Sequence, residues 1–441
     1  MRQPTRGEYV NHPSQRGLYF TSSEHDQLRA EVRQWAELHV SPRIPQMESL
    51  RRVDVALSRL IARQGWIGVT VPPEYGGMGL GHLAKTIIIE ELARISGAMG
   101  AMVQASQLGT AKILHWGTDE QKRRWLPAIA AGECLPTIAT TEKGSGGQVG
   151  AIATTARREG DEYVLNGSKV WVGNSHVGDL HGVIVRTGEG SRGLTAFLVE
   201  ATRPGCTLAP HPEMLGLHGF SFGEIRFDDC RVPIENRIGA EGDGLAVAFS
   251  SSVLYGRPNL TAVSLGIHQA AVETTNQYTS EVQRYGNPLS MKETIRNKIA
   301  EMQSNLMTAR ILAYHAADSL DRGLACDAEL MNAKLENVKL SKRSVDLAME
   351  IHAAYGLVSA HEVSRLYRDV VHIEPPAGTS DIQRVRLAEV SLGEARPEWS
   401  QRFSGELRAS TAARERALSA PAEHPVVHAG ESASPVPQPV L

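Results

Sequence analysis

The feature that most restricts the fold of this chain is a double change of hydrophobic periodicity along its 441 residues. Apolar residues recur at helical spacing from about residue 22, short β-branched and aromatic runs replace that spacing near Glu133, and helical spacing returns after Gly244. A period of about 3.6 residues fits an amphipathic helix and a period of about 2 fits a strand. The sequence therefore predicts a helical part, a β part and a second helical part, in that order.

Both helical parts carry apolar residues at alternating steps of three and four. In the first part these are Leu28, Val32, Trp35 and Leu38. In the second they are Ile295, Ile299, Met302, Leu306, Ala309 and Ala313. Thr118 is a suitable N-cap for a helix over 119–131, and the Pro and Gly residues of VPPEYGGMGLG (71–81) predict a loop. We expect a C-terminal bundle of four or five long helices.

The middle part, to about Pro233, is predicted to be an antiparallel β domain. Asn166 and Gly167 stand between two strand-like segments in EYVLNGSKVWV, which is typical of a tight hairpin turn. GVIVRT and LTAFLVE form a second pair, joined by GEGSRG. The predicted boundaries are an N-terminal extension over 1–21, a helical domain over 22–133, a β domain over 134–236, a helical bundle over 237–395, an extra helical segment over 396–418 and a disordered, Pro-rich tail over 419–441.

Charge and cysteine content exclude several classes of protein. With 46 Lys and Arg against 49 Asp and Glu, and a net charge of -3, neither a nucleic acid nor an anionic membrane is an expected partner. Four cysteines without a CxxC pair give no disulfide framework or zinc ribbon, and no HExxH motif occurs. Neither a secretory signal nor an apolar run of about 18 residues is present, so we expect a cytoplasmic protein.

The most informative segment is TIATTEKGSGGQ (137–148), between the first two domains. Its glycines at 144, 146 and 147 allow a ligand to approach the backbone, and Thr140 and Thr141 add hydroxyl groups. Alone, this pattern is more typical of a structural turn, since it matches neither the Walker nor the Rossmann spacing.

Five segments in a fixed order resemble the acyl-CoA dehydrogenase family of flavoproteins. They are VPPEYGGMGLG (71–81), TEKGSGG (141–147) with GDEYVLNGSKVWVGN (160–174), FDDCRVPIENRIGAEGDG (227–244), YGNPL (285–289) and AGTSDIQR (377–384). The resemblance implies an α+β fold with an N-terminal helical domain, a middle β domain and a C-terminal four-helix bundle. It also implies FAD as cofactor and a dimeric or tetrameric assembly.

The chemistry implied by the resemblance is α,β-dehydrogenation of an acyl thioester. A carboxylate removes the α-proton, the flavin takes the β-hydride, and an electron-transfer flavoprotein or oxygen reoxidises the flavin. Thr141 corresponds to a threonine that bonds the flavin, and Trp171 to an aromatic residue beside the isoalloxazine ring, although a place in the β core is the alternative for Trp171. The predicted cofactor-binding residues are Thr140, Thr141, Gly146, Gly147, Trp171, Gly173, Arg284, Thr379 and Asp381.

The catalytic carboxylate of the family is missing from both of its known positions. The position directly before Gly-Thr is Ala377, and the position before an arginine in an earlier helix is Gly256, followed by Arg257. The catalytic candidates are therefore Glu374, as a displaced base, and Arg257. Asp381 and Tyr255 are weaker candidates for the base, a solvated carboxylate is the alternative for Glu374, and His372 has no spacing that supports a role.

Other departures affect the part of the family's FAD site that reaches across a dimer. Val282 replaces an arginine for which Arg284 substitutes in part, and further changes give Glu293, Glu350, Ala353 and Ala354. The two carboxylates would repel a pyrophosphate unless they are paired or protonated. In addition, Gly147, Gln148 and Gly173 replace hydroxyl or carboxylate residues, His218 replaces an arginine, and Phe220 and Phe222 replace small hydroxyl residues.

Three functions remain open. The first is an FAD-dependent dehydrogenase acting on an acyl-CoA or an acyl carrier protein, with a displaced or missing base. The second is a subunit without its own complete active site in an assembly of different chains. The third is a flavin oxidase or monooxygenase on the same fold.

Overall fold

The computed structural model describes residues 20–394, 396–409 and 411. The N-terminal helices are α1 (Ser23–His39), α2 (Ile44–Leu50), α3 (Val55–Ala62), α4 (Gly81–Ile95), α5 (Gly97–Trp116) and α6 (Asp119–Ala130). Thr118 caps α6 by accepting a hydrogen bond from Gln121 N, as predicted. The predicted tail and parts of the predicted terminal segments lie outside the described residues.

The middle strands form an eight-stranded mixed sheet in the order β6-β7-β3-β2-β4-β5-β8, with β1 beside β4. The strands are β1 (Pro136–Ala139), β2 (Thr155–Glu159), β3 (Glu162–Gly173), β4 (Leu180–Arg186), β5 (Leu194–Glu200), β6 (Cys206–Leu208), β7 (Phe222–Pro233) and β8 (Arg237–Ile238). β4 and β5 are the antiparallel pair predicted from GVIVRT and LTAFLVE. The sheet is not wholly antiparallel, because β1 and β2 both pair with β4 in parallel.

The hairpin turn predicted at Asn166 and Gly167 is wrong. β3 continues through both residues, and the turn between β2 and β3 lies at Gly160 and Asp161, where Gly160 has φ 63°. Gly167 instead has φ 138° in a bulge opposite β7, and a Cβ there would lie 2.8 Å from Thr154 Cα. The positive φ of Gly167 therefore serves a bulge and not a hairpin turn.

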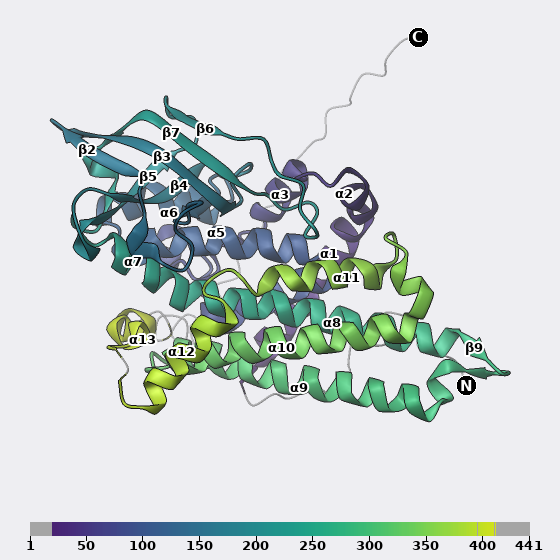
Figure 1. The fold of residues 1–441 in the computed structure, drawn as a ribbon. Helices are drawn as coiled ribbons and strands as arrows, with labels where there is room; N and C mark the ends of the chain where they lie inside the picture. The colour runs from purple at the N-terminus through teal and green to yellow at the C-terminus, as the bar shows by residue number, and fades with distance from the viewer. Residues whose placement is uncertain (1–19, 395, 410, 412–441) are drawn as a thin grey trace, which may run out of the picture.

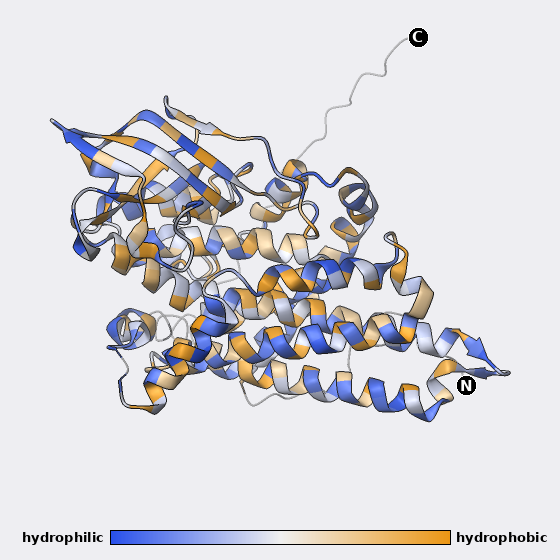
Figure 2. Ribbon diagram, viewed as in Figure 1, coloured by the Kyte–Doolittle hydropathy of each residue, from blue (hydrophilic) through white to orange (hydrophobic). Residues whose placement is uncertain are grey.

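The C-terminal part contains the bundle helices and a short β-hairpin. Its elements are α7 (Gly244–Ser251), a π-helical turn (Ser252–Gly256), α8 (Arg257–Glu281), β9 (Gln283–Arg284), β10 (Asn287–Pro288), α9 (Glu293–Asp321), α10 (Asp327–His352), α11 (Glu362–Val370), α12 (Ser380–Ser391) and α13 (Trp399–Arg402). Among the described residues α8, α9 and α10 have 25, 29 and 26 residues, whereas α11 and α12 have 9 and 12, so three rather than the predicted four or five helices of the bundle are long. Figure 2 shows apolar and polar residues alternating along these helices, and the stripe from Ile295 to Ala313 is packed or partly buried in the bundle core as predicted.

Helix α5 runs between the sheet and α8, so that it joins the β domain to the bundle (Figure 1). The largest core cluster lies along it and includes Met99, Val103 and Ile113 of α5, together with Leu198 of β5 and Val263 of α8. Among the described residues, no helix is both long and apolar enough to span a membrane.

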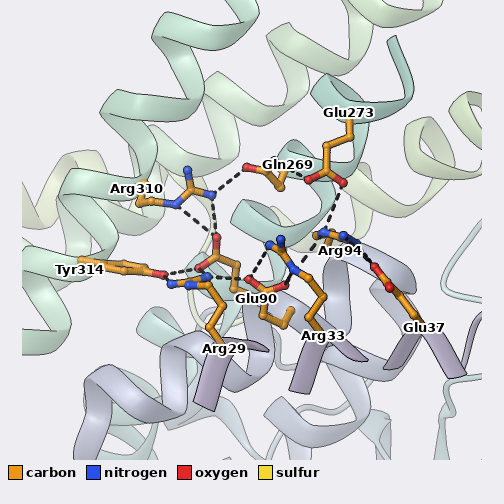
Figure 3. A network of polar contacts seen from close by, with 10 residues as sticks. Arg29, Arg33, Glu37, Glu90, Arg94, Gln269, Glu273, Arg310 and Tyr314 are labelled. Carbon is orange, nitrogen blue, oxygen red and sulfur yellow. Dashed lines mark hydrogen bonds and ion pairs between the residues drawn. The ribbon is translucent and has the colours of Figure 1, made fainter. Parts of the chain in front are cut away.

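A buried ionic network fixes α1 against α4, α8 and α9 (Figure 3). Glu91 of α4 accepts hydrogen bonds from Arg29 at 2.6 Å and from Arg33 at 2.8 Å, and its neighbour Glu90 is 2.7 Å from Arg310 of α9. Leu38 of α1 was expected in the buried stripe but is 67% exposed. The buried face of α1 therefore includes Arg29 and Arg33 in place of Leu38, because the carboxylates of α4 neutralise the two arginines.

Candidate functional site

The loop after β1 is held by a buried lysine on β3. Lys169 Nζ lies 2.6 Å from Glu142 Oε1 and donates to the Thr140 carbonyl at 3.1 Å, and Val170 N donates to the Thr141 carbonyl at 2.8 Å. Burial lowers the pKa of Lys169 to about 8, against the opposing effect of Glu142. The backbone that carries the two predicted flavin-binding threonines is thus fixed from the sheet side.

The outer side of this loop is open to a ligand. A Cβ added at Gly144, Gly146 or Gly147 would meet no atom within 4 Å, and none of the three has the positive φ that requires glycine. The Thr140 hydroxyl oxygen is buried without a hydrogen-bond partner in the described part of the chain. Packing within the chain therefore does not require the glycines, whereas close approach of a ligand accounts for both features.

Trp171 projects from β3 beside this loop. It lies in a bulge between Lys169 and Val172, has φ 57°, and is 52% exposed. Its indole stacks on the ring of Phe222 with the ring centroids 5.9 Å apart. The alternative of a β-core residue is wrong. A strained bulge that presents a large aromatic ring to solvent is typical of a binding position.

Gly173 and Phe220 are two departures from the family pattern that depend on each other. A Cβ at Gly173 would lie 3.0 Å from Ala105 Cβ and 3.1 Å from Phe220 Cζ. The ring of Phe220, which is 8% exposed, fills the space that a larger residue at position 173 would need. Phe220 therefore leaves room for a glycine at 173 but not for the larger hydroxyl residue that the family resemblance places there.

We expect Gly173→Thr to destabilise the protein by about 1–3 kcal/mol, because the added atoms overpack a filled space. The double variant Gly173→Thr/Phe220→Ser should recover most of that loss. Urea unfolding of the two single variants and the double variant measures the coupling, with Gly146→Ala as the control in open space. Purely additive effects would contradict the pairing.

The two empty base positions lie side by side. A Cβ built on Gly256 would be 3.0 Å from Ala377 Cβ and 3.8 Å from Leu108 Cδ1. Gly256 closes the π-helical turn that leads into α8, and Ala377 lies in the loop before α12 with φ 56°. π-Helical turns are frequent at functional sites. Side chains at the two positions where the family resemblance places a carboxylate would therefore enter one space.

Helix α5 brings this space together with the loop beside β3. Ala105 faces the Gly173 position and Leu108 faces the Gly256 position. Residues three apart on a helix are neighbours on one face, with Cβ atoms about 5–6 Å apart. Gly173, two residues after Trp171 on β3, and the space at Gly256 and Ala377 therefore lie against the same face of α5.

Two buried side chains hold the loop that carries Ala377 by hydrogen bonds to its backbone carbonyls. Lys334 Nζ donates to the Glu374 carbonyl at 3.0 Å and also to the carbonyls of Pro376 and Gly378. Gln383 Nε2 donates to the Ala377 carbonyl at 3.0 Å. Burial, aided by the charge of Arg257, lowers the pKa of Lys334 to about 7.

Other candidate residues lie at or near this loop but are already occupied. Glu374 Oε2 is 2.8 Å from Lys342 Nζ, which lowers its pKa and makes it a poor proton acceptor. Thr379 caps α12 by accepting from Ile382 N, and the 89% exposed side chain of Asp381 pairs with Arg384. These contacts account for all three residues as structural elements of the loop and of α12.

Tyr255 and His372 are also held by structural contacts. The Tyr255 hydroxyl donates to Thr70 Oγ1 at 3.1 Å, and burial raises the pKa of this tyrosine. The hydroxyl group of Tyr255 therefore points to the N-terminal domain, which does not favour a role as a base. His372 Nε2 accepts a hydrogen bond from Gly216 N at 3.0 Å.

The residues predicted to reach a partner's FAD lie on the surface. Arg284 is exposed on β9 and donates to the Gln283 carbonyl. Glu350 was predicted to repel a pyrophosphate unless its carboxylate is paired. Its Oε2 is 2.5 Å from Lys298 Nζ, so the carboxylate is paired. Glu293 is exposed. Ala353 has φ 50°, so its Cβ stands at a backbone position that favours glycine.

Sequence reasoning missed Lys334, Gln383, Ala105 and Leu108. Lys334 lies within an apolar helical stripe that includes Leu330, Met331 and Val338, and a lysine at such a position is a signal that could have found it. The two residues of α5 carry no polar group, so only the three-dimensional contacts identify them.

Three family models match consecutive parts of the chain. The N-terminal domain of acyl-CoA dehydrogenase matches residues 22–133, its middle domain residues 137–230 and its C-terminal domain residues 242–392. An acyl-CoA dehydrogenase of Bacillus subtilis (strain 168) is 34% identical over 84% of this chain and 99% of its own length.

Two solved structures share the fold. A glutaryl-coenzyme A dehydrogenase in complex with glutaryl-CoA is 32% identical, with a TM-score of 0.82 over 86% of this chain and 98% of that one. The prolyl acyl carrier protein oxidase AnaB is 28% identical, with a TM-score of 0.79 over 84% of this chain and 99% of that one.

Proposed function

Because the chain belongs to the acyl-CoA dehydrogenase family, we propose that it is an FAD-dependent oxidoreductase that binds an acyl thioester and lacks the usual carboxylate base. The observation that carries the proposal is the shared face of α5, which contacts both Gly173, two residues after exposed Trp171, and the space between Gly256 and Ala377. The substrate is an acyl-CoA or an acyl carrier protein.

Thr140, Thr141 and Trp171 would hold the flavin of this proposal. The unpartnered Thr140 hydroxyl, the open glycine loop and the exposed indole all fit such a ligand. FAD supplies the acceptor for two electrons. The chain itself supplies the surface that orients the thioester, and α5, Phe220 and the Ala377 loop exclude water from it.

Without a basic side chain at Ala377 or Gly256, the α-proton of a bound acyl thioester would be removed slowly. A general base contributes about 100-fold to 10,000-fold to a rate, and neither Ala377 nor Gly256 has a group that can accept a proton. Glu374 is held by Lys342 at 2.8 Å. We therefore favour a missing base over the displaced base Glu374.

The test is anaerobic mixing of the FAD-loaded chain with saturated acyl-CoAs of several lengths. Binding should perturb the flavin absorption bands, and bleaching of the bands should be slow or absent. Fast bleaching by an unmodified acyl-CoA would show that the chain has a base that this account overlooks. An unperturbed spectrum with every thioester would contradict acyl thioester binding.

A second candidate is a subunit of an assembly of different chains, with an electron-transfer flavoprotein as acceptor. Ala353 at φ 50° and exposed Glu293 favour it, because both stand where a FAD shared across two identical chains would need glycine and a neutral side chain. Co-expression with related chains, followed by the measurement of mass and FAD per assembly, decides. A homotetramer with one FAD per identical chain would exclude this candidate.

The third candidate is an oxidase, in which oxygen accepts the electrons. The similarity to AnaB, a prolyl acyl carrier protein oxidase by name, favours it. Oxygen uptake that depends on an acyl thioester supports this candidate, and reoxidation by an artificial acceptor alone would count against it.

A further inference from the structure

Three aromatic rings form a row from the core to the surface. Phe220 is 8% exposed and belongs to the largest core cluster, Phe222 is partly buried against the same cluster, and Trp171 is 52% exposed. The ring centroids of Phe220 and Phe222 are 6.1 Å apart, and those of Phe222 and Trp171 are 5.9 Å apart, with interplanar angles of 31° and 30°. Aromatic rings attract one another at centroid distances of about 4.5–7 Å. The exposed indole is therefore connected to the core through two further rings.

The middle ring of this row is held by the backbone that carries it. Phe222 N donates a hydrogen bond to His211 Nε2 at 3.0 Å, and Gly223 N donates one to Ser175 Oγ at 3.0 Å. Phe222 is also paired with Gly173 between β7 and β3. A phenylalanine side chain has only two rotatable bonds, so a fixed backbone leaves its ring few orientations. The sheet thus determines where the face of the Phe222 ring lies.

The outer ring depends on that face for its orientation. Trp171 lies in a bulge with φ 57°, and a bulge can turn a side chain away from the regular alternation of a strand. An indole that is mostly exposed would otherwise occupy several rotamers, and ordering it when a ligand binds would lower the affinity. The contact with Phe222 restricts the indole before any ligand arrives.

The surroundings of Trp171 fit a flat ligand. Val170 N, next to Trp171 in the chain, donates to the Thr141 carbonyl, so the indole stands beside the open glycine loop. The same loop carries the Thr140 hydroxyl, which has no hydrogen-bond partner within the described chain. An exposed indole can stack on a second flat ring. The small hydroxyl residue that the family resemblance places at position 222 would offer the indole no ring face.

We propose that Phe222 is a positioning residue that holds the Trp171 indole as a platform for a flat aromatic ring of the ligand. The identity of that ring rests on the proposed function, in which it is the isoalloxazine of FAD. The adenine of FAD or of a CoA offers the same flat aromatic chemistry, and the experiment separates the two sources. The support that Phe222 gives to Trp171 does not depend on the proposed function.

The first test is a binding cycle on the full-length, FAD-free chain, titrated calorimetrically with FAD and with ADP, which carries adenine without the flavin ring. Phe222→Leu should weaken FAD binding about 2-fold to 10-fold, the usual worth of an aromatic pair, and should leave ADP binding unchanged. Phe222→Tyr keeps a ring and should retain the natural affinity. With Trp171→Ala in the background, Phe222→Leu should have no further effect.

Phe197→Leu is the matched control. Phe197 is buried in β5 of the same sheet and packs on the Tyr163 ring, with centroids 4.7 Å apart, so its loss should lower stability and leave FAD affinity unchanged. Equal FAD affinity in Phe222→Leu, or a loss that is as large when Trp171 is absent, would overturn the inference. Weakening of ADP by the same factor as FAD would assign the platform to adenine and refute the flavin ring as its ligand.

The second test needs no ligand. The near-ultraviolet circular dichroism of Trp171 is the difference between a chain and its Trp171→Ala variant. This signal should decrease in Phe222→Leu and persist in Phe222→Tyr and in Phe197→Leu, because only the first removes the ring beside the indole. An unchanged signal in Phe222→Leu would overturn the positioning role whether or not FAD binds. Failure of the natural chain to bind FAD, with the signal decreased in Phe222→Leu, would refute the proposed function and keep the support of Trp171 by Phe222.

Discussion

Ala377→Glu is expected to raise the rate of flavin reduction by a simple saturated acyl-CoA about 100-fold to 10,000-fold, the usual contribution of a general base. The side chain would enter the space between residues 377 and 256, which no other carboxylate of the described chain occupies. Anaerobic stopped-flow mixing with acyl-CoA measures the rate.

Two matched variants control this experiment. Ala377→Gln has the same size but no basic group, and should give no gain. Gly256→Glu places a carboxylate in the same space from the other side, because the two Cβ positions are 3.0 Å apart, and should exceed Gly256→Gln. No gain from Ala377→Glu with FAD bound and the fold intact would show that the missing base is not the only obstacle to dehydrogenation.

Glu91→Gln is expected to lower the free energy of unfolding by about 3–5 kcal/mol, because it removes the carboxylate that pairs with buried Arg33 and one of the two that pair with buried Arg29. Glu91 contacts Arg29 and Arg33 at 2.6 and 2.8 Å, and the side chains of all three residues are at most 9% exposed. Urea unfolding measures the loss. Glu336→Gln, which breaks an exposed pair with Lys339, is the control and should change stability by less than about 0.5 kcal/mol.

The pH dependence of this loss follows from the pKa of Glu91. Burial would raise that pKa, but Arg33 and Arg29 outweigh burial and lower it to about 2. A lowered carboxyl pKa stabilises the folded state above the unfolded value of about 4.3, and the stabilisation is lost as the pH falls towards the folded value. The difference between the natural chain and Glu91→Gln should therefore narrow between about pH 5 and pH 2. A difference that grows in acid would contradict the role of the ion pairs.

The order of the domains could be predicted from the sequence because each helix or strand has a local period. The stripe on α9 and the cap of α6 depend on neighbouring residues alone, and both predictions are confirmed. Asn166 and Gly167 show the limit of such reasoning, because an Asn-Gly pair marks positive φ without saying whether a turn or a bulge uses it. The exposure of Leu38 depends on the carboxylates of α4, which are distant in the sequence.

The site could be predicted only in part for the same reason. Motif order predicted a binding role for the glycine loop and for Trp171, and showed that Ala377 stands where a carboxylate was expected. Gly256 and Ala377 are adjacent only in the folded chain, where the start of α8 meets the loop before α12. The lack of a hydrogen-bond partner for Arg257 Nε in the described part of the chain likewise depends on segments that are distant in the sequence. Phe220 explains Gly173 in the same way, since the two residues are 47 positions apart and share one space.

The central claim is that this chain holds a flavin in a site without a base. The most direct measurement is the visible spectrum and the FAD content of the isolated chain after saturation with FAD and removal of the excess. We expect flavin absorption bands, about one FAD per chain, and quenching of the fluorescence of exposed Trp171 that is absent in Trp171→Phe. A chain that retains no FAD and shows no spectral change on its addition would contradict the account.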